Sequence, residues 1–346
     1  MNFFSAQDKA RRNTRLLLLL FIIAVATLIA LTNILVAVTL ITIDSNSANS
    51  VIQQLNLREL VQWPLVIKIS CFVTLVISSV VIFKWLQLNA GGKYIAETLG
   101  GARLSPNTTN TEEKRALNVV EEMAIASNMP VPVVYVLPNE KGINAFAAGN
   151  TPADAVIGIT RGAIEQFNRE QLQGVIAHEF SHILNGDMRL NGRMIAMLSG
   201  ITFIGTIGEI FLRSGGRHGA YTNTKRSNDA RLAMLGLALL AAGWLGTFFG
   251  SLIKAAISRQ REFLADASAV QFTRNPQGIA DALKIIGGYD QGSKIINPKA
   301  ELISHMYIAN GLIGKSLFRT HPSLQDRIFR IEPNWDRRMI GRNTKR

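Results

Sequence analysis

The sequence predicts a mainly α-helical membrane protein that carries a small antiparallel β-meander. Three observations support this fold class: apolar runs long enough to cross a bilayer, a stretch between them patterned like a water-soluble domain, and three short β-rich segments inside that stretch. Hydrophobic residues make up 48% of the 346 residues, and charged residues make up only 18%. Because the apolar residues are concentrated in the runs, we expect membrane segments and a soluble domain in one chain.

The N-terminal part predicts two transmembrane helices. Residues 1–15 are basic, and the apolar run that follows over residues 16–43 is far longer than the hydrophobic part of a signal peptide. Residues 44–64 form a short polar loop, and a second apolar run covers residues 65–86. About 20 residues span the hydrocarbon core, so both runs are long enough to cross. The positive-inside rule places the N-terminus and the chain after Lys93 in the cytoplasm, with the short loop outside.

Residues 87–193 are expected to form the first part of the soluble domain. Apolar residues at helical spacing predict an amphipathic helix over residues 110–128. Short segments at residues 131–136, 143–149 and 155–160, bounded by turn residues, predict three strands. We expect these strands to pair in chain order, which gives the antiparallel meander.

A further helix of this domain carries the most informative motif of the chain. A capping box predicts that the helix starts at Asn168, and a glycine stop signal ends it at Gly186. The pentapeptide His178-Glu-Phe-Ser-His182 lies inside it, and two histidines four residues apart project from the same face of a helix. Both imidazoles can therefore bind one tetrahedral zinc ion, and Glu179 between them can act as general base on an activated water.

Residues 194–257 predict a hydrophobic helical hairpin made of two apolar runs. The hairpin either crosses the membrane as a third and a fourth transmembrane helix or lies buried in the domain or on the membrane surface. The loop between the runs, residues 213–231, is basic, which is unusual for an external loop. Glu209 in the first run is expected to pair with Arg213, one turn later. Residues 258–346 are expected to form the second part of the soluble domain.

A zinc hydrolase needs a third protein ligand, with one position left for water. Glu262 is the best candidate, because it follows the fourth apolar run and an antiparallel hairpin would return it to the face that carries His178 and His182. It lies only about 7.5 Å along a helix from the apolar segment, so the site is expected close to the membrane. Asp266, one turn later on the same face, is expected to accept a hydrogen bond from a ligating imidazole. The alternative is a solvent-exposed acidic face, on which the two carboxylates pair with neighbouring arginines.

The charge and the cysteine count exclude several other classes. The net charge is +13, but the basic residues lie beside apolar runs and no basic and aromatic nucleic-acid motif is present. We therefore expect no nucleic-acid partner and a preference for anionic lipid instead. Cys71 is the only cysteine, which excludes a disulfide framework within the chain and a zinc site built from thiolates.

Four motifs in order give the chain a family resemblance over roughly residues 100–335. They are His178-Glu-Phe-Ser-His182, Asn185-Gly-Asp187, Ser258-Arg-Gln-Arg-Glu262 with Asp266, and Thr320-His-Pro-Ser323 with Arg327. Together they resemble the HtpX-type membrane zinc endopeptidases, a gluzincin family that also includes the CAAX prenyl proteases. The resemblance implies a gluzincin-like metalloprotease domain, one zinc ion held by the residues at 178, 182 and 262, and the glutamate at 179 as base. It also implies quality control of membrane polypeptides, with misfolded proteins among the substrates, in the bacterial cytoplasmic membrane.

Further roles are assigned to residues outside the zinc motif. The resemblance suggests that His321 is catalytic, either by stabilising the oxyanion or as a reversible fourth ligand; the alternative is a local helix cap. Asn144, Ala145 and Phe146 are expected to bind substrate as an edge strand that pairs with an extended peptide, the alternative being an ordinary core strand.

Two other functions compete with a general membrane endopeptidase. One is a dedicated processing protease for a single substrate, such as a prenylated C-terminus. The other is a zinc-binding membrane scaffold or chaperone without turnover, which the presence of both base and ligands disfavours. The sequence predicts no oligomeric state.

Overall fold

The structure of the chain, a computed structural model, is described here for residues 3–44, 63–88, 91–216, 223–290, 292–293, 295, 308 and 319–341. The chain folds into two compact units. The mixed α/β unit comprises Met1–Leu18, Leu88–Gly192 and Lys254–Arg346, and the helical unit comprises Leu19–Gln87 and Arg193–Ile253.

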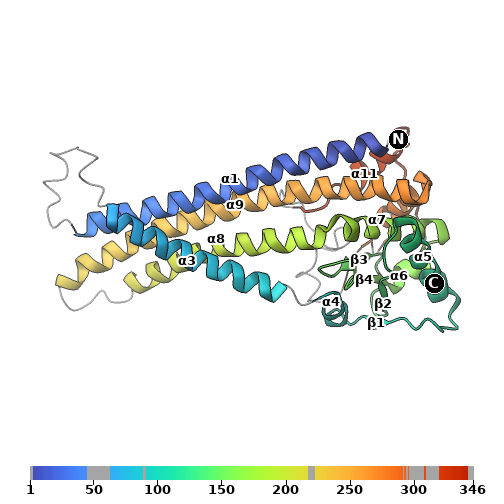
Figure 1. Ribbon diagram of the computed structural model, residues 1–346, viewed down its shortest axis with the longest axis horizontal. Coiled ribbons are helices and arrows are strands. Elements are labelled where there is room, and N and C mark those ends of the chain that lie inside the picture. Colours follow the sequence, from blue (N-terminus) through green and yellow to red (C-terminus); the bar gives the residue numbers. More distant parts are fainter. Residues whose placement is uncertain are drawn as a thin grey trace. The chain divides into compact units, whose positions relative to one another are not determined.

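The helical unit is built from parts of long helices. These are α1 (Phe3–Asp44), α3 (Trp63–Leu88), α8 (Asp187–Gly216) and α9 (Asn223–Thr273) (Figure 1). Within the described residues, these four helices are long and apolar enough to cross a membrane. They contain the apolar runs identified in the sequence, and large side chains such as Phe72 and Trp244 are about two-thirds exposed, at 68% and 65%. Most of the polar loop expected at 44–64, and the middle of the basic loop expected at 213–231, lie outside the described residues.

Glycines bring α8 and α9 into backbone contact within the helical unit. A Cβ atom at Gly208 would lie 2.5 Å from the backbone nitrogen of Leu240 and 2.6 Å from the carbonyl oxygen of Gly236. A Cβ atom at Gly243 would lie 2.5 Å from the Cα atom of Gly205. Because a membrane offers no hydrophobic driving force between helices, close packing of this kind is what holds them together.

The mixed α/β unit contains a small sheet of four strands in the described residues. The strands are β1 (Ala102–Arg103), β2 (Val133–Leu137), β3 (Ala145–Ala148) and β4 (Val156–Thr160), in the order β1-β2-β4-β3. The three predicted strands are present, but the antiparallel meander is wrong. Strands β2 and β4 pair in parallel, while β3 pairs antiparallel with β4 at the edge and β1 pairs antiparallel with β2.

The burial of the strands explains the difference. All five residues of β4 and four of the five in β2 are buried, so neither strand alternates between core and solvent. Continuous burial of this kind is typical of parallel strands with both faces covered, whereas a half-exposed antiparallel hairpin alternates. The short apolar runs could not by themselves distinguish these pairings.

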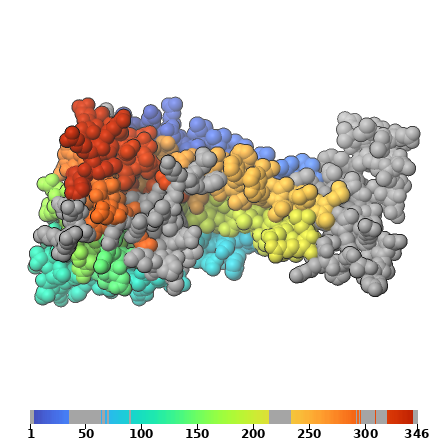
Figure 2. All heavy atoms as spheres, turned by 180° about the vertical axis from the view of Figure 1, so that it is seen from behind, coloured from blue at the N-terminus to red at the C-terminus, as the bar shows by residue number. Residues whose placement is uncertain are grey.

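Among the described residues of this unit, six further helices accompany the sheet. They are α4 (Gly92–Thr98), α5 (Thr111–Ser127), α6 (Arg161–Gln166), α7 (Arg169–Asn185), α10 (Pro276–Gly288) and α11 (Leu324–Ile331). Helix α7 is central, because α5, α10 and β3 all pack against it. Gly174 lets α10 come close, since a Cβ atom there would lie 2.5 Å from the backbone nitrogen of Ile279. Helix α11 packs on α10, and the C-terminal residues that include α11 form the red part of the surface in Figure 2.

Local sequence signals set the ends of the central helix. The Asn168 side chain accepts from the backbone N–H of Gln171 at 2.9 Å, and the Gln171 side chain accepts from the N–H of Asn168 at 2.9 Å. This confirms the predicted capping box. Gly186 ends the helix in the left-handed conformation, with φ 65° and ψ 31°, which favours glycine. The helix predicted over residues 110–128 is also confirmed, as α5.

The basic N-terminal residues are part of α1. Gln7 is buried, and its amide donates to Gln271 at 2.7 Å and to Ser268 at 3.3 Å. Asn13 donates to Gln260 at 3.2 Å. The first turns of α1 therefore pack along the C-terminal half of α9 within the mixed α/β unit.

Candidate metal centre

Helix α7 directs two imidazoles toward one point. His178 is fully buried and the His182 side chain is 14% exposed. Their Nε2 atoms lie 3.1 Å apart, and the two rings meet edge to face with centroids 4.7 Å apart. The spacing of four residues produces this geometry, because one helical turn separates the two side chains.

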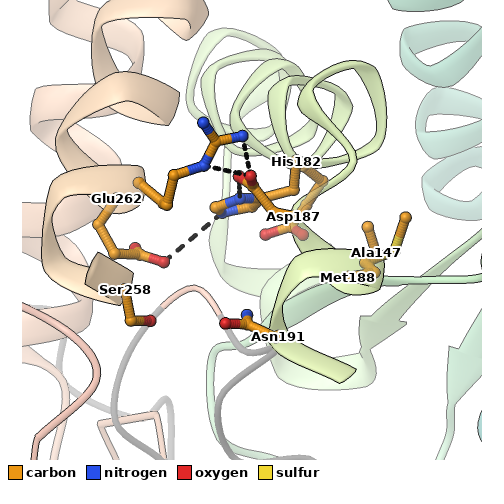
Figure 3. Close-up of a pocket in the computed structure, with 9 residues that line it drawn as sticks. Ala147, His182, Asp187, Met188, Asn191, Ser258 and Glu262 are labelled. Carbon is orange, nitrogen blue, oxygen red and sulfur yellow. Dashed lines mark hydrogen bonds and ion pairs between the residues drawn. The ribbon is translucent and has the colours of Figure 1, made fainter. Parts of the chain in front are cut away.

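Glu262 reaches the same point from α9. Its two carboxylate oxygens lie 3.5 Å from Nε2 of His178 and 3.5 Å from Nε2 of His182. One ligand atom from each of the three residues can be chosen so that all lie within 4.8 Å of one another. Figure 3 shows two of these side chains, His182 and Glu262, joined by a dashed line. Two imidazole nitrogens and a carboxylate form a donor set that suits Zn²⁺ and leaves a fourth position free. The structure thus brings together the three side chains that the sequence predicts as ligands.

Glu179 is a buried carboxylate without a hydrogen-bond partner among the described residues. It is 1% exposed, and neither of its carboxylate oxygens has a hydrogen-bond partner among the described residues. Burial raises the pKa of Glu179, and the charges of His182 and His178 oppose this effect only in part. A buried carboxylate is costly unless it is paired, so an unpartnered one beside a ligand cluster is typical of a catalytic group.

Asp266 and Arg327 hold the other nitrogen of His178. Asp266 Oδ1 lies 3.0 Å from Nδ1 of His178, as expected for a partner that orients a ligating ring. Arg327 is fully buried and donates to both oxygens of Asp266, at 2.6 and 2.9 Å. Burial and the Arg327 charge lower the pKa of His178, but hydrogen bonds to Asp266 and Glu262 outweigh them and raise it to about 9. A metal ion would therefore displace a proton from this ring.

His321 lies in the same cluster. It is 3% exposed, and its Nδ1 lies 3.2 Å from a Glu262 oxygen. It directly precedes Pro322 and the Ser323 cap of α11, whose side chain accepts from the backbone N–H of Asp326 at 3.0 Å. His321 therefore lies just before the start of α11, two residues ahead of its cap.

The predicted substrate strand is at the edge of the sheet, but its first residues are already bonded. The Asn144 side chain donates to the carbonyl oxygen of Ser293 and accepts from the N–H groups of Ala145 and Ile308. The carbonyl oxygen of Ala145 accepts from Ile308 at 3.0 Å. Phe146 is buried opposite Gly158 in the antiparallel ladder.

Ala147 is the edge residue that reaches the pocket. Along a strand of an antiparallel pair, the backbone N–H and C=O groups of one residue bond the neighbouring strand, and those of the next residue point away from it. Asn144 bonds Thr160 of β4, so the N–H and C=O of Ala147, three residues on, point outward. Neither group has a partner among the described residues, and Ala147 lines the pocket with Glu179, His182 and Glu262 (Figure 3).

Four polar pocket residues were not predicted to act at the site. Asp187, Asn191, Ser258 and Arg261 line the same pocket. Asp187 directly follows the glycine that ends the ligand helix, and Ser258 precedes Glu262 by one turn, so both spacings were visible in the sequence. The contact between Asp187 and Arg261 was not, because 74 residues separate them.

A buried glutamate between two imidazoles, a carboxylate from a later helix and several membrane-length helices define a membrane metallopeptidase. Comparison with known proteins agrees: residues 110–334 match peptidase family M48. The chain therefore belongs to peptidase family M48.

Similar proteins are named "Protease HtpX homolog". The protein from Streptococcus uberis is 38% identical over 221 residues, which cover 62% of this chain and 71% of that protein. The protein from Caldanaerobacter subterraneus subsp. tengcongensis is 36% identical over 261 residues, which cover 73% and 81%. The protein from Dictyoglomus thermophilum is 38% identical over 239 residues, which cover 68% and 73%. A solved structure, that of S. mikatae Ste24p, shares 16% identity with a TM-score of 0.40 over 78% of this chain and 57% of that one.

Proposed function

We propose that this protein is a zinc-dependent endopeptidase of the bacterial cytoplasmic membrane, which hydrolyses membrane or membrane-associated, misfolded polypeptides in protein quality control. The observation that carries the proposal is the unpartnered Glu179 carboxylate beside the His178, His182 and Glu262 cluster. A structural zinc site has no use for such a carboxylate, whereas hydrolysis needs a base next to the metal. The similar bacterial proteins bear the name protease, which supports the same reading.

Each side chain has a role in hydrolysis. His178, His182 and Glu262 would hold Zn²⁺. When bound, the ion would polarise the scissile carbonyl and lower the pKa of a water molecule toward about 7. Glu179 accepts a proton from the attacking water while the oxygen of that water bonds to the carbonyl carbon. The carbon–nitrogen bond then breaks, and Glu179 delivers the proton to the leaving amine.

His321 is assigned to the developing oxyanion. It lies against Glu262 inside the cluster, so its imidazole is close to where the carbonyl oxygen must enter. A positioned donor stabilises the charge that forms on this oxygen in the transition state.

Strand β3 is assigned to the substrate backbone. An extended peptide that adds to a sheet edge gains main-chain hydrogen bonds without depending on its sequence, as a quality-control protease requires. Asn144 directly precedes this strand, Ala145 and Phe146 begin it, and Ala147 offers the outward N–H and C=O at the pocket. We therefore place the pairing contact with substrate at Ala147, with Asn144 and Ala145 holding the strand in place.

The membrane and its lipids complete the proposal. The basic residues Lys9, Arg11, Arg12 and Arg15 are all exposed on α1. Exposed cations beside an apolar helix favour anionic headgroups and the cytoplasmic side, where we place the active site. We propose polypeptides and anionic lipid as partners, and no nucleic acid.

The test is the variant Glu179→Gln in the purified full chain. The substitution keeps the shape but removes the base, so we expect hydrolysis of an unfolded protein to fall by at least about 100-fold. Zinc content should remain, because Glu179 is not a ligand. Glu170→Gln is the control, since Glu170 is exposed in the first turn of the same helix.

Metal removal tests the cofactor separately. A chelator should abolish hydrolysis by wild type and added Zn²⁺ should restore it. Undiminished hydrolysis by Glu179→Gln, or by chelated protein, would contradict the proposal.

A further inference from the structure

The carboxylate of Asp187 contacts the ring of His182 on its Nδ1 side, opposite the nitrogen that faces Glu262. Asp187 Oδ2 lies 2.7 Å from Nδ1 of His182, and Asp187 is 4% exposed (Figure 3). An ionised carboxylate only accepts hydrogen bonds, so this contact requires a proton on Nδ1 of His182. In a neutral imidazole with its proton on Nδ1, the lone pair is on Nε2, the atom that faces Glu262. Asp187 thus selects the tautomer that can bind a metal ion.

The turn after the ligand helix puts Asp187 in this position. The backbone N–H of Gly186 bonds back to the carbonyl oxygens of His182 and Ile183, which closes α7. Its left-handed conformation ends α7, and α8 begins at the next residue, Asp187. The carboxylate therefore returns to the histidine five residues before it.

Arg261 fixes Asp187 in turn. Its guanidinium bonds Asp187 Oδ1, the oxygen that does not face His182, and also donates to the carbonyl oxygen of Asn185 at 3.0 Å. The Arg261 side chain is 13% exposed, so both partners are largely shielded from water. Arg261 directly precedes Glu262 on α9. This helix therefore supplies one candidate ligand, Glu262, and also the cation that holds the partner of a second candidate ligand, His182.

The two imidazoles therefore have matching supports. His178 is backed by Asp266 and Arg327, and His182 is backed by Asp187 and Arg261. The first pair is fully buried, but the second lines the pocket. An ion pair that only joined two helices would not need one carboxylate oxygen aimed at a ligand nitrogen.

We propose that Asp187 and Arg261 are positioning residues for the metal: Arg261 holds Asp187, and Asp187 fixes the orientation and tautomer of His182. This inference rests on the proposed zinc function. Partners of this kind contribute to metal affinity, since their loss typically weakens binding by about 10- to 100-fold.

The test measures zinc affinity of the full-length chain by competition with a chelating dye. Asp187→Ala should raise the Kd for Zn²⁺ by about 10- to 100-fold, and Asp187→Asn should recover part of the loss because its amide oxygen can accept from Nδ1. Arg261→Met should weaken binding by a smaller factor. In the double variant Asp187→Ala, Arg261→Met, the effect should not exceed that of Asp187→Ala alone, since Arg261 acts through Asp187.

Arg189→Met is the matched control. Arg189 lies in the same first turn of α8 and donates to the carbonyl oxygen of Asn150 at 2.7 and 3.1 Å, away from the imidazoles. Its Kd should stay within about twofold of wild type, because it supports no ligand. The melting temperature of the metal-free protein is recorded for every variant. If Asp187→Ala does not fold, Arg261→Met, which leaves the carboxylate in place, gives the same comparison.

The outcomes separate this inference from the function on which it rests. If wild type binds no zinc, the proposed function fails. If wild type binds zinc and hydrolyses substrate, but Asp187→Ala and Arg261→Met bind zinc as wild type does and only lose melting temperature, the pair is a structural link. That result would overturn the positioning role alone.

Discussion

Arg327 is a fully buried cation that holds two carboxylates near the site. It donates to Asp266 at 2.6 and 2.9 Å, lies 3.3 Å from a Glu262 oxygen and donates to the carbonyl oxygen of Ile308. Removing one partner of a buried charge network leaves the others uncompensated, which costs about 3–5 kcal/mol. We expect Arg327→Met to lower the free energy of unfolding by this amount, measured by denaturation in detergent.

Arg330→Met provides the comparison on the same helix. Arg330 is exposed, and its guanidinium lies 3.5 Å from the centroid of the Phe263 ring. An exposed cation–π contact contributes about 1 kcal/mol at most, so this variant should be only slightly destabilised. Equal losses for the two variants would mean that burial of Arg327 does not matter.

Asp154 predicts a pH dependence away from the site. Burial raises its pKa, but hydrogen bonds from the Thr151 hydroxyl and from the backbone N–H groups of Asn150 and Thr151 outweigh burial and lower it below the usual 3.8. A carboxylate with a lowered pKa in the folded state stabilises above its unfolded pKa, and the effect disappears as the pH falls through the folded pKa.

The variant Asp154→Asn tests this dependence. Because Asp154 is exposed and screened by water, we expect its melting temperature at pH 7 to be lower than that of wild type by at most about 3 °C. The difference should close below about pH 4. A constant difference across a melting series from about pH 3 to pH 7 would contradict the assignment.

The contact between α8 and α9 depends on where their glycines lie. A Cβ atom at Gly208 would press on the backbone at Leu240 and Gly236, whereas one at Gly205 would lie 3.5 Å from Gly243, at ordinary contact distance. We therefore expect Gly208→Ala to destabilise the helical unit by about 1–3 kcal/mol, as overpacking does, and Gly205→Ala to be tolerated. Melting in detergent or protease resistance of the membrane segments measures both.

The two variants add the same methyl group to the same helix, three residues apart. Helix propensity and hydrophobicity change equally in both, so any difference reports the contact with α9. If Gly205→Ala destabilised the protein as much as Gly208→Ala, the close contact at Gly208 would not be its cause.

Elements governed by neighbours in the chain were predictable from the sequence. The capping box at Asn168 and the glycine stop at Gly186 act within a few residues, so their pattern determines the ends of α7. The start of α1 at Phe3 was not predicted, because the side chains that favour it, such as Gln7, bond partners more than 250 residues away. The parallel pairing of β2 and β4 likewise depends on burial on both faces of the sheet, which a short apolar run does not reveal.

The residues of the candidate metal centre likewise fall into those that the sequence predicted and those that it did not. His178, Glu179 and His182 share one helix, so their spacing alone predicts their common face. Glu262 was predicted from its place after an apolar run. Arg261 was not, since nothing local shows that it turns to Asp187 rather than to solvent.

Helices α1, α8 and α9 each run from one unit of the molecule into the other. Helix α1 passes from the mixed α/β unit into the helical unit, and α8 and α9 each have residues in both. The site residues Asp187 and Glu262 are thus on the same continuous helices as the apolar segments that follow and precede them. Hydrolysis and membrane anchoring cannot be separated by cutting the chain between domains.

The helices α8 and α9 are expected to cross the membrane. From Arg193 to Gly216 and from Asn223 to Ile253 they are unbroken and longer than the roughly 20 residues that a span requires. The basic loop between them opposes this topology, but the first helix usually dominates orientation. Because both ends of the pair belong to the mixed α/β unit, two crossings return the chain to its own side.

Cysteine labelling decides between crossing and a hairpin that stays on one side. In a Cys71→Ser background, Ser47→Cys and Ser105→Cys serve as references for the outside and the cytoplasm. We expect a membrane-impermeant maleimide to label His218→Cys in intact cells, as it labels Ser47→Cys, while Ser105→Cys reacts only after permeabilisation. Labelling of His218→Cys only after permeabilisation would show that the basic loop stays in the cytoplasm with the active site, and α8 and α9 would then be a membrane-embedded hairpin rather than two spans.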